Sequence, residues 1–204
     1  NKRWIVQHIM FKYHPICNLL HCKLLSFLLV RNMDFYYCFA QLTITNNYQI
    51  YMNTLGLRAS PSTVYFCIYD STDDSIINLE QIAIPNVFET PEKLKYLRIT
   101  ILDIIREYEV QKAGIRLSEL HPSAKPNVTR IQFEGIIQEA FASSSLQSYF
   151  RGTIVTIASL LERRSREIKP LIDGTQTIEH LDEWADYSKE ERESILAAMG
   201  AKNA

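Results

Sequence analysis

The chain has 204 residues, of which 47% are hydrophobic and 22% are charged, and its formal net charge is −1. This size and composition suit an ordinary globular domain with a sizeable core. A net charge close to zero excludes a global basic field that would attract nucleic acid or an anionic membrane, so a site for a polyanion must be local. The four cysteines, Cys17, Cys22, Cys38 and Cys67, suggest no disulfide framework. We therefore expect a cytoplasmic protein in a reducing environment.

The first quarter of the chain differs in composition from the rest. Residues 1–51 contain one acidic residue, Asp34, no glycine and a single alanine, and no clean helical or alternating period runs through most of them. Their most apolar run, residues 24–30, is far shorter than the roughly 20 apolar residues of a membrane-spanning helix. We predict a boundary at Met52: residues 1–51 are an N-terminal extension, non-native or poorly ordered, and residues 52–204 are the domain, with no membrane association.

Regular patterning begins just after this boundary with a predicted antiparallel meander. Three short segments rich in apolar, β-branched and aromatic residues are separated by clusters of turn-forming residues. These predicted strands cover residues 54–59, 63–69 and 75–84. An amphipathic helix is predicted from Thr90 to about Tyr108, because a hydroxyl, a proline and an acid follow one another at its start.

The second half of the chain alternates predicted strands and helices. Three of the helices open on a hydroxyl residue followed three positions later by Glu or Gln, which is the pattern of a capping box. The predicted elements are a strand over 112–119, a helix over 129–149, a strand over 152–157, a basic helix opening at Ser159 and a last helix from Ser188 to Gly200. This order predicts an α/β fold, a mixed five-stranded sheet of three antiparallel and then two parallel strands, flanked by helices.

This order of elements resembles the ribonuclease-H-like (RNase H-like) superfamily, and within it the RuvC-like Holliday-junction resolvases. The likeness covers residue 53 to about residue 200 and includes three short segments, 55–57, 115–119 and 167–174. It implies phosphodiester hydrolysis by two Mg²⁺ ions that acidic residues hold. It also implies structured or branched DNA as a partner, and a homodimer.

The resemblance implies particular site residues in this chain. Glu119 matches the acid at the end of the fourth strand, and Lys169 matches a basic residue after the fifth. Acids of the last helix would come from Glu190, Glu191 and Glu193, of which the first and last lie three apart on one face. Glu119, Glu190 and Glu193 are therefore the candidate catalytic residues, and Glu119 is the candidate metal ligand.

One position departs from the family's pattern. The residue after the segment 55–57, where the family has an aspartate, is Arg58. A guanidinium stays protonated in proteins and cannot ligate a metal. It would also repel one, because a unit charge pair about 4 Å apart is worth ~4 kcal/mol at an effective dielectric near 20, and a divalent ion roughly doubles that. We therefore expect no cofactor, or Mg²⁺ if catalysis survives.

Three functions stay open. In the first, a degenerate domain binds nucleic acid without cutting it, with Arg58 and Lys169 on phosphates. In the second, the chain is a Mg²⁺-dependent endonuclease with rearranged carboxylates. In the third, it is a non-catalytic interaction module in which Arg58 and Glu119 form a buried ion pair. A basic strip would add to DNA binding, unless Glu162 and Glu167 pair with it on a solvated helix face. The strip consists of Arg163, Arg164 and Arg166.

Overall fold

The computed structural model describes residues 52–119, 125–181 and 183–204, so the prediction for residues 1–51 lies outside the described part. The strands are β1 (Asn53–Ala59), β2 (Thr63–Asp70), β3 (Ser75–Ala83), β4 (Lys112–Arg116) and β5 (Ser148–Gly152). The helices are α4 (Thr90–Glu107), α5 (Val128–Ala142), α6 (Ile154–Leu160), α7 (Ser165–Asp173) and α8 (Lys189–Ala201). No helix among these described residues is both long and apolar enough to cross a membrane.

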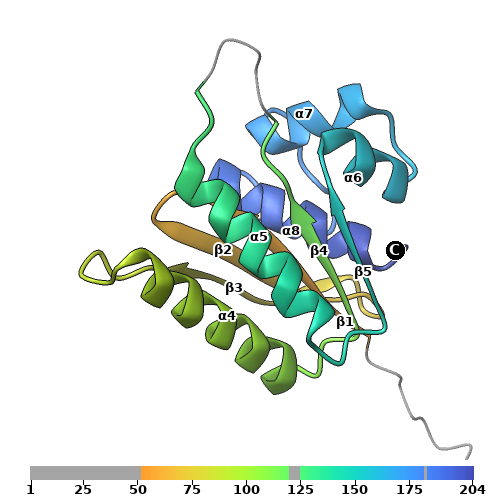
Figure 1. The fold of residues 1–204 in the computed structure, drawn as a ribbon. Coiled ribbons are helices and arrows are strands. Elements are labelled where there is room, and N and C mark those ends of the chain that lie inside the picture. Colours follow the sequence, from red (N-terminus) through yellow and green to blue (C-terminus); the bar gives the residue numbers. More distant parts are fainter. Residues whose placement is uncertain (1–51, 120–124, 182) are drawn as a thin grey trace, which may run out of the picture. The chain divides into compact units, whose positions relative to one another are not determined.

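The five strands form one mixed sheet in the order β3-β2-β1-β4-β5. β1, β2 and β3 pair antiparallel, whereas β1, β4 and β5 pair parallel (Figure 1). This topology confirms the predicted α/β fold. It also confirms that the first and fourth strands run side by side in the same direction, so their carboxyl ends meet at one edge of the sheet.

Each face of the sheet has its own core. Alternate residues of a strand point to opposite faces, and Leu55 and Leu57 are buried against α4 and α5 on one of them. The other face is covered by α6, α7 and α8. There, a Cβ atom at Gly56 would overlap the backbone oxygen of Ser194 and the backbone nitrogen of Ala198. α8 therefore packs directly on the backbone of β1.

The region of the fifth strand differs from the prediction. α5 ends at Ala142, and β5 pairs with β4 over Ser148–Gly152, whereas the segment 154–160 is helical. Its β-branched residues favour a strand, but Ile157 and Ala158 lie on one side of α6 and are buried in the α8-side core. Tertiary burial therefore overrides the local preference.

Two predicted helix starts were also wrong. The side chain of Asn127, two residues before Thr129, caps α5 by accepting a hydrogen bond from the backbone of Arg130 at 2.9 Å. Ser159 lies inside α6, and the next helix begins only at Ser165. Asn127 thus meets one of the unpaired amides at the start of α5, and before α7 the Glu167 carboxylate accepts a hydrogen bond from the backbone of Arg164 at 3.3 Å.

The capping box at the last helix is confirmed. The Ser188 hydroxyl accepts a hydrogen bond from the backbone of Glu191 at 3.3 Å, and the Glu191 carboxylate accepts one from the backbone of Ser188 at 2.6 Å. α8 continues through Gly200 and ends at Ala201. The capping box therefore sets the start of α8, the helix on which the buried Glu193 lies.

Candidate functional site

The carboxyl edge of β1 and β4 carries two buried arginines. The two strands repeat the pattern glycine, apolar residue, arginine, and Gly56 pairs with Gly114 just as Arg58 pairs with Arg116. Because the glycines and arginines are two residues apart, both arginines point to the face that α8 covers. The Arg58 side chain is 11% exposed and that of Arg116 is 4% exposed.

Glu193 of α8 lies between these two arginines. Its Oε2 forms an ion pair with Nε of Arg58, and its Oε1 lies 3.5 Å from Nε of Arg116. The Glu193 side chain is 3% exposed. Arg58 also donates from Nη1 to the backbone oxygen of Arg116 at 3.3 Å, which ties the two strand ends together. The result is a buried network, Arg58–Glu193–Arg116, which we call the arginine cluster.

The third hypothesis required an ion pair between Glu119 and Arg58, and this pair is not formed. β4 ends at Arg116, so Glu119 follows the strand instead of lying on it, and its side chain is 48% exposed. Its Oε1 lies 3.3 Å from Nη2 of Arg116 and accepts a hydrogen bond from the backbone of Ile154 at 3.0 Å. Glu119 therefore links the end of β4 to the start of α6. The position beside Arg58 that was predicted for Glu119 is occupied by Glu193.

Burial and neighbouring charges affect ionisable groups at this edge. Burial lowers the pKa of the Arg116 guanidinium, the Glu193 carboxylate opposes this, and the positive charge of Arg58 lowers it again. On β2, burial raises the pKa of the Tyr65 phenol, and the charges of Glu190 and Glu191 raise it further. Tyr65 pairs with Arg58 in the sheet. The predicted acids Glu190 and Glu193 are thus near the same strand end, but only Glu193 joins the arginine cluster.

A further buried carboxylate, missed from the sequence, holds the exit of β4. Glu134 of α5 accepts hydrogen bonds from the backbone and the hydroxyl of Ser118, at 2.8 and 3.1 Å. It also pairs with Arg130 at 3.2 Å, four residues earlier on the helix. Both oxygens of Glu134 are therefore engaged in positioning the segment that leads to Glu119.

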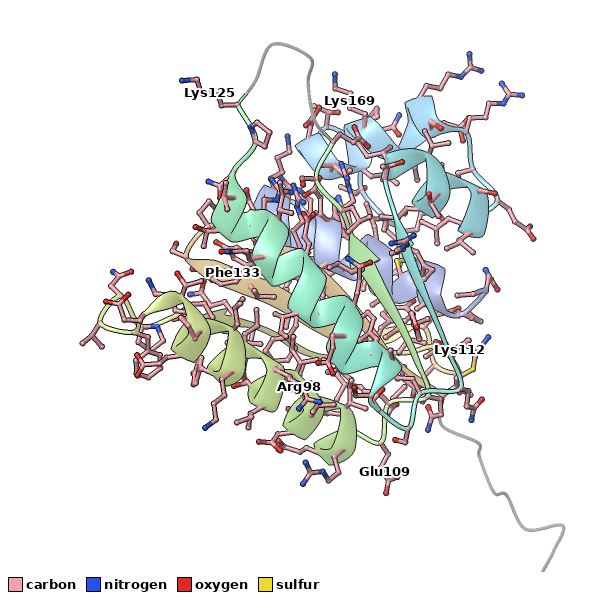
Figure 2. All side chains as sticks on the ribbon, in the orientation of Figure 1. Arg98, Glu109, Lys112, Lys125, Phe133 and Lys169 are labelled. Atoms are coloured by element: carbon pink, nitrogen blue, oxygen red, sulfur yellow. The ribbon has the colours of Figure 1, made fainter. Side chains whose placement is uncertain are left out.

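A pocket of about 580 Å³ opens beside Glu119, between the start of α6 and one side of α7. Three predicted residues, Glu119, Arg166 and Lys169, line it together. Figure 2 shows Lys169 and Lys112 at opposite ends of the sheet, which places Lys169 at the carboxyl end of β4. The tertiary structure thus brings together an acid and two bases that lie up to 50 positions apart in the sequence.

The basic strip and the nearby Lys169 are exposed on the surface. Arg163 and Arg164 precede α7, and Arg166 and Lys169 lie on it. All four residues are exposed, and none of their side chains takes part in an ion pair within the part of the chain that the structure describes. The expected pairing with Glu162 and Glu167 is therefore not formed. Four positive charges are available on this side of the domain.

The residues at this edge do not fit a pair of Mg²⁺ ions. Hard divalent cations need several free oxygen ligands, whereas both oxygens of Glu193 face guanidinium groups. Over residues 52–119, 125–181 and 183–204, no group of three or more His, Cys, Asp or Glu side chains is arranged to hold a metal ion. The arginine cluster instead occupies the carboxyl edge of β1 and β4 with two guanidinium groups and one paired carboxylate.

The meander, the parallel pairing of β1, β4 and β5 and the helices on both faces make up a mixed five-stranded α/β fold. The structure is similar to that of Thermus thermophilus RuvC, with a TM-score of 0.58 and 9% sequence identity, over 73% of this chain and 92% of that one. It is also similar to T. thermophilus RuvC in complex with a Holliday junction substrate, with a TM-score of 0.54 and 9% identity, over 73% and 91% of the two chains. No protein-family model and no curated protein matches the sequence.

Arg116, like Glu134, was not predicted from the sequence as a residue of this site. A signal for it was present, because Gly114-Ile115-Arg116 repeats Gly56-Leu57-Arg58. Once the two strands are predicted to be parallel neighbours, the repeat predicts paired glycines under a closely packed helix and paired arginines at the strand ends. Two buried like charges need a counter-ion, and in the structure Glu193 provides it.

Proposed function

We propose that residues 52–204 form a degenerate resolvase-like domain that binds structured or branched DNA and does not cut it by the two-metal route. The observation that supports this proposal best is Glu193, buried with one oxygen toward Arg58 and the other toward Arg116. Removing one partner from a buried ion pair typically costs ~3–5 kcal/mol. A metal ion would have to displace two fixed guanidinium groups before Glu193 could become a ligand.

The DNA contacts are assigned to the exposed bases. Lys169, with Arg163, Arg164 and Arg166, presents free positive charge, and such side chains bind phosphates independently of base sequence. Arg58 receives a different role from the one first predicted. Because its side chain is only 11% exposed and is paired with Glu193, we assign it to holding α8 against the strand ends.

DNA binding is tested by fluorescence anisotropy with a four-way junction and a linear duplex at several salt concentrations. We expect affinity to fall as salt rises, and Lys169→Ala to reduce the salt slope by about one phosphate contact. Lys95→Ala is the matched control, because Lys95 is an exposed lysine of α4 on the other side of the sheet. Equal slopes for the two variants would contradict the assignment of Lys169.

A cleavage assay with Mg²⁺ separates this proposal from the two alternatives. We expect no Mg²⁺-dependent cleavage by the wild-type chain. Cleavage that is lost in Glu119→Gln would instead establish an active endonuclease that uses Glu119 with Glu190. Absence of both DNA binding and cleavage would favour a protein-interaction module. The buried ion pairs of the arginine cluster are compatible with such a module, because they need no ligand.

We propose a cytoplasmic location on the basis of the cysteine content. We further infer a homodimer, because the arms of a four-way junction are equivalent and a symmetric pair of domains can contact two of them in the same way. Sedimentation equilibrium of the full chain with and without junction DNA tests this inference. A strictly monomeric chain that binds the junction with one-to-one stoichiometry would contradict it.

A further inference from the structure

The pocket beside Glu119 has an apolar wall that faces solvent. Val155, the second residue of α6, is 64% exposed and lines the pocket together with Ile154 and with Pro170 of α7. Exposed apolar side chains inside a concave site suggest contact with an apolar part of a ligand. A flat aromatic ring fits such a wall, because stacking needs a surface and no particular hydrogen bonds.

The rim of the same pocket has both signs of charge. Lys169 and Arg166 are exposed bases, whereas Glu119 and Asp173 are acids. Asp173 pairs with Lys189, with 3.8 Å between Oδ1 and Nζ. A site for phosphate alone would gain nothing from the Glu119 carboxylate, since like charges repel. Carboxylates do accept hydrogen bonds from the amino groups of nucleobases. Glu119 uses Oε1 for both its contact with Arg116 and its bond from Ile154, and its Oε2 is used by neither.

We propose that this pocket binds one unpaired nucleotide, with the base against Val155 and Pro170, the edge of the base toward Glu119, and the phosphate on Lys169 and Arg166. The pocket, at about 580 Å³, lies within the range of ~300–1,000 Å³ common for small-ligand sites. The proposal deepens the function proposed above, on which it rests: the DNA that this domain prefers would contain a nucleotide outside the duplex.

The experiment compares two DNAs of equal length at the same salt concentration, a fully paired duplex and a duplex with a short single-stranded flap. Stacking of one base adds ~1–3 kcal/mol, so we expect the wild-type chain to bind the flap DNA about 5- to 150-fold more tightly. The variant Val155→Glu places a negative charge on the apolar wall. Val155→Glu should remove most of the preference for the flap DNA. Its affinity for the fully paired duplex should stay close to that of the control variant Val87→Glu.

The matched control is Val87→Glu, because Val87 is also exposed, at 84%, and lies in the connection before α4, outside the pocket. It introduces the same charge and measures its general effect on DNA binding. Lys169→Ala is the second test variant, and it should weaken binding to the flap DNA more than Lys95→Ala does. Thermal unfolding of each variant shows whether the fold is kept, as expected for substitutions at exposed positions.

Free deoxyguanosine monophosphate, as a competitor of the flap DNA, shows whether the pocket takes a nucleotide outside a strand. If the free nucleotide displaces the flap DNA from the wild-type chain but not from Val155→Glu, the result supports the pocket. This holds even where the affinity for long DNA is weak. If the wild-type chain binds both DNAs equally, or if Val155→Glu and Val87→Glu behave alike, the pocket proposal is overturned and the DNA-binding function stands. If the wild-type chain binds neither DNA nor the free nucleotide, both proposals fail.

Discussion

The two faces of the β1–β4 pair are built on different principles. Toward α4 and α5, the paired residues are wholly apolar and fully buried: Leu55, Leu57, Ala113 and Ile115. Toward α8, the paired residues at the centre are glycines and those at the carboxyl edge are arginines: Gly56, Arg58, Gly114 and Arg116. The first face buries side chains, whereas the second brings a helix backbone against the sheet and encloses charge at its edge.

The two faces of the β1–β4 pair should differ in how freely their residues can be replaced. Apolar residues of similar size can replace one another in a core at small cost, so the α4–α5 face tolerates substitution. A buried ion pair is often no more stabilising than apolar residues of the same volume, yet breaking it is expensive. The arginine cluster is therefore a costly arrangement at the edge where the open α/β sheet would place a ligand.

The largest effect is expected from removing the counter-ion of the two arginines. Glu193→Ala leaves two buried guanidinium groups facing each other without a carboxylate between them, so we expect a loss of ~3–5 kcal/mol in the free energy of unfolding. Urea denaturation followed by circular dichroism measures it. Glu190→Ala, three residues earlier on the same helix, is the matched control and should cost much less. A loss below about 1 kcal/mol for Glu193→Ala would show that the arginine cluster contributes little.

A smaller effect is expected from a methyl group between β1 and α8. In Gly56→Ala the new Cβ would overlap the backbone of Ser194 and Ala198, which cannot rotate away, and such overpacking costs ~1–3 kcal/mol. Gly135→Ala is the opposite control, because nothing lies within 4 Å of its Cβ position in the middle of α5. That substitution should stabilise the domain by ~0.5–1 kcal/mol. The same denaturation experiment compares them, and equal effects would contradict the close packing of α8.

The α8-side face should also respond to alkaline pH. Burial raises the pKa of the Cys67 thiol above its ordinary value of 9.0, so the native state keeps a proton that the unfolded chain loses. The unfolded state then binds fewer protons, and the free energy of unfolding should fall above about pH 9 by ~1.4 kcal/mol per pH unit. Unfolding of the wild type and of Cys67→Ala between about pH 8 and 10 checks this. An identical pH dependence in both chains would contradict it.

The smallest effect is expected from breaking an exposed ion pair between α4 and α5. Arg98 of α4 pairs with Glu139 of α5, but these side chains are 37% and 45% exposed. Solvent and salt screen such pairs, so Arg98→Ala should shift the midpoint of thermal unfolding only slightly, and not at all in about 1 M NaCl. A large shift that persists in high salt would mean that this exposed pair matters as the arginine cluster does.

Most of the fold could be predicted from local patterns. The meander, the long amphipathic α4 and the capping box at Ser188 depend on residues close together in the chain, where turn chemistry and periodicity act directly. The fifth strand could not be placed this way. The β-branched segment 154–160 is helical because Ile157 and Ala158 are buried in the core that α6 shares with α8, and these two helices lie far apart in the sequence.

The sequence alone was sufficient for the class of fold, for the parallel pairing of the first and fourth strands, and for the loss of an acid at Arg58, since residue type and order decide these. The pairing of Arg58 with Glu193 instead of Glu119, and the part that Arg116 takes in the arginine cluster, could be seen only in the folded structure. A buried charged side chain pairs with an opposite charge that is close in space, and residues close in space can be far apart in the sequence. The paired glycines let α8 approach closely enough for Glu193 to reach both strand ends.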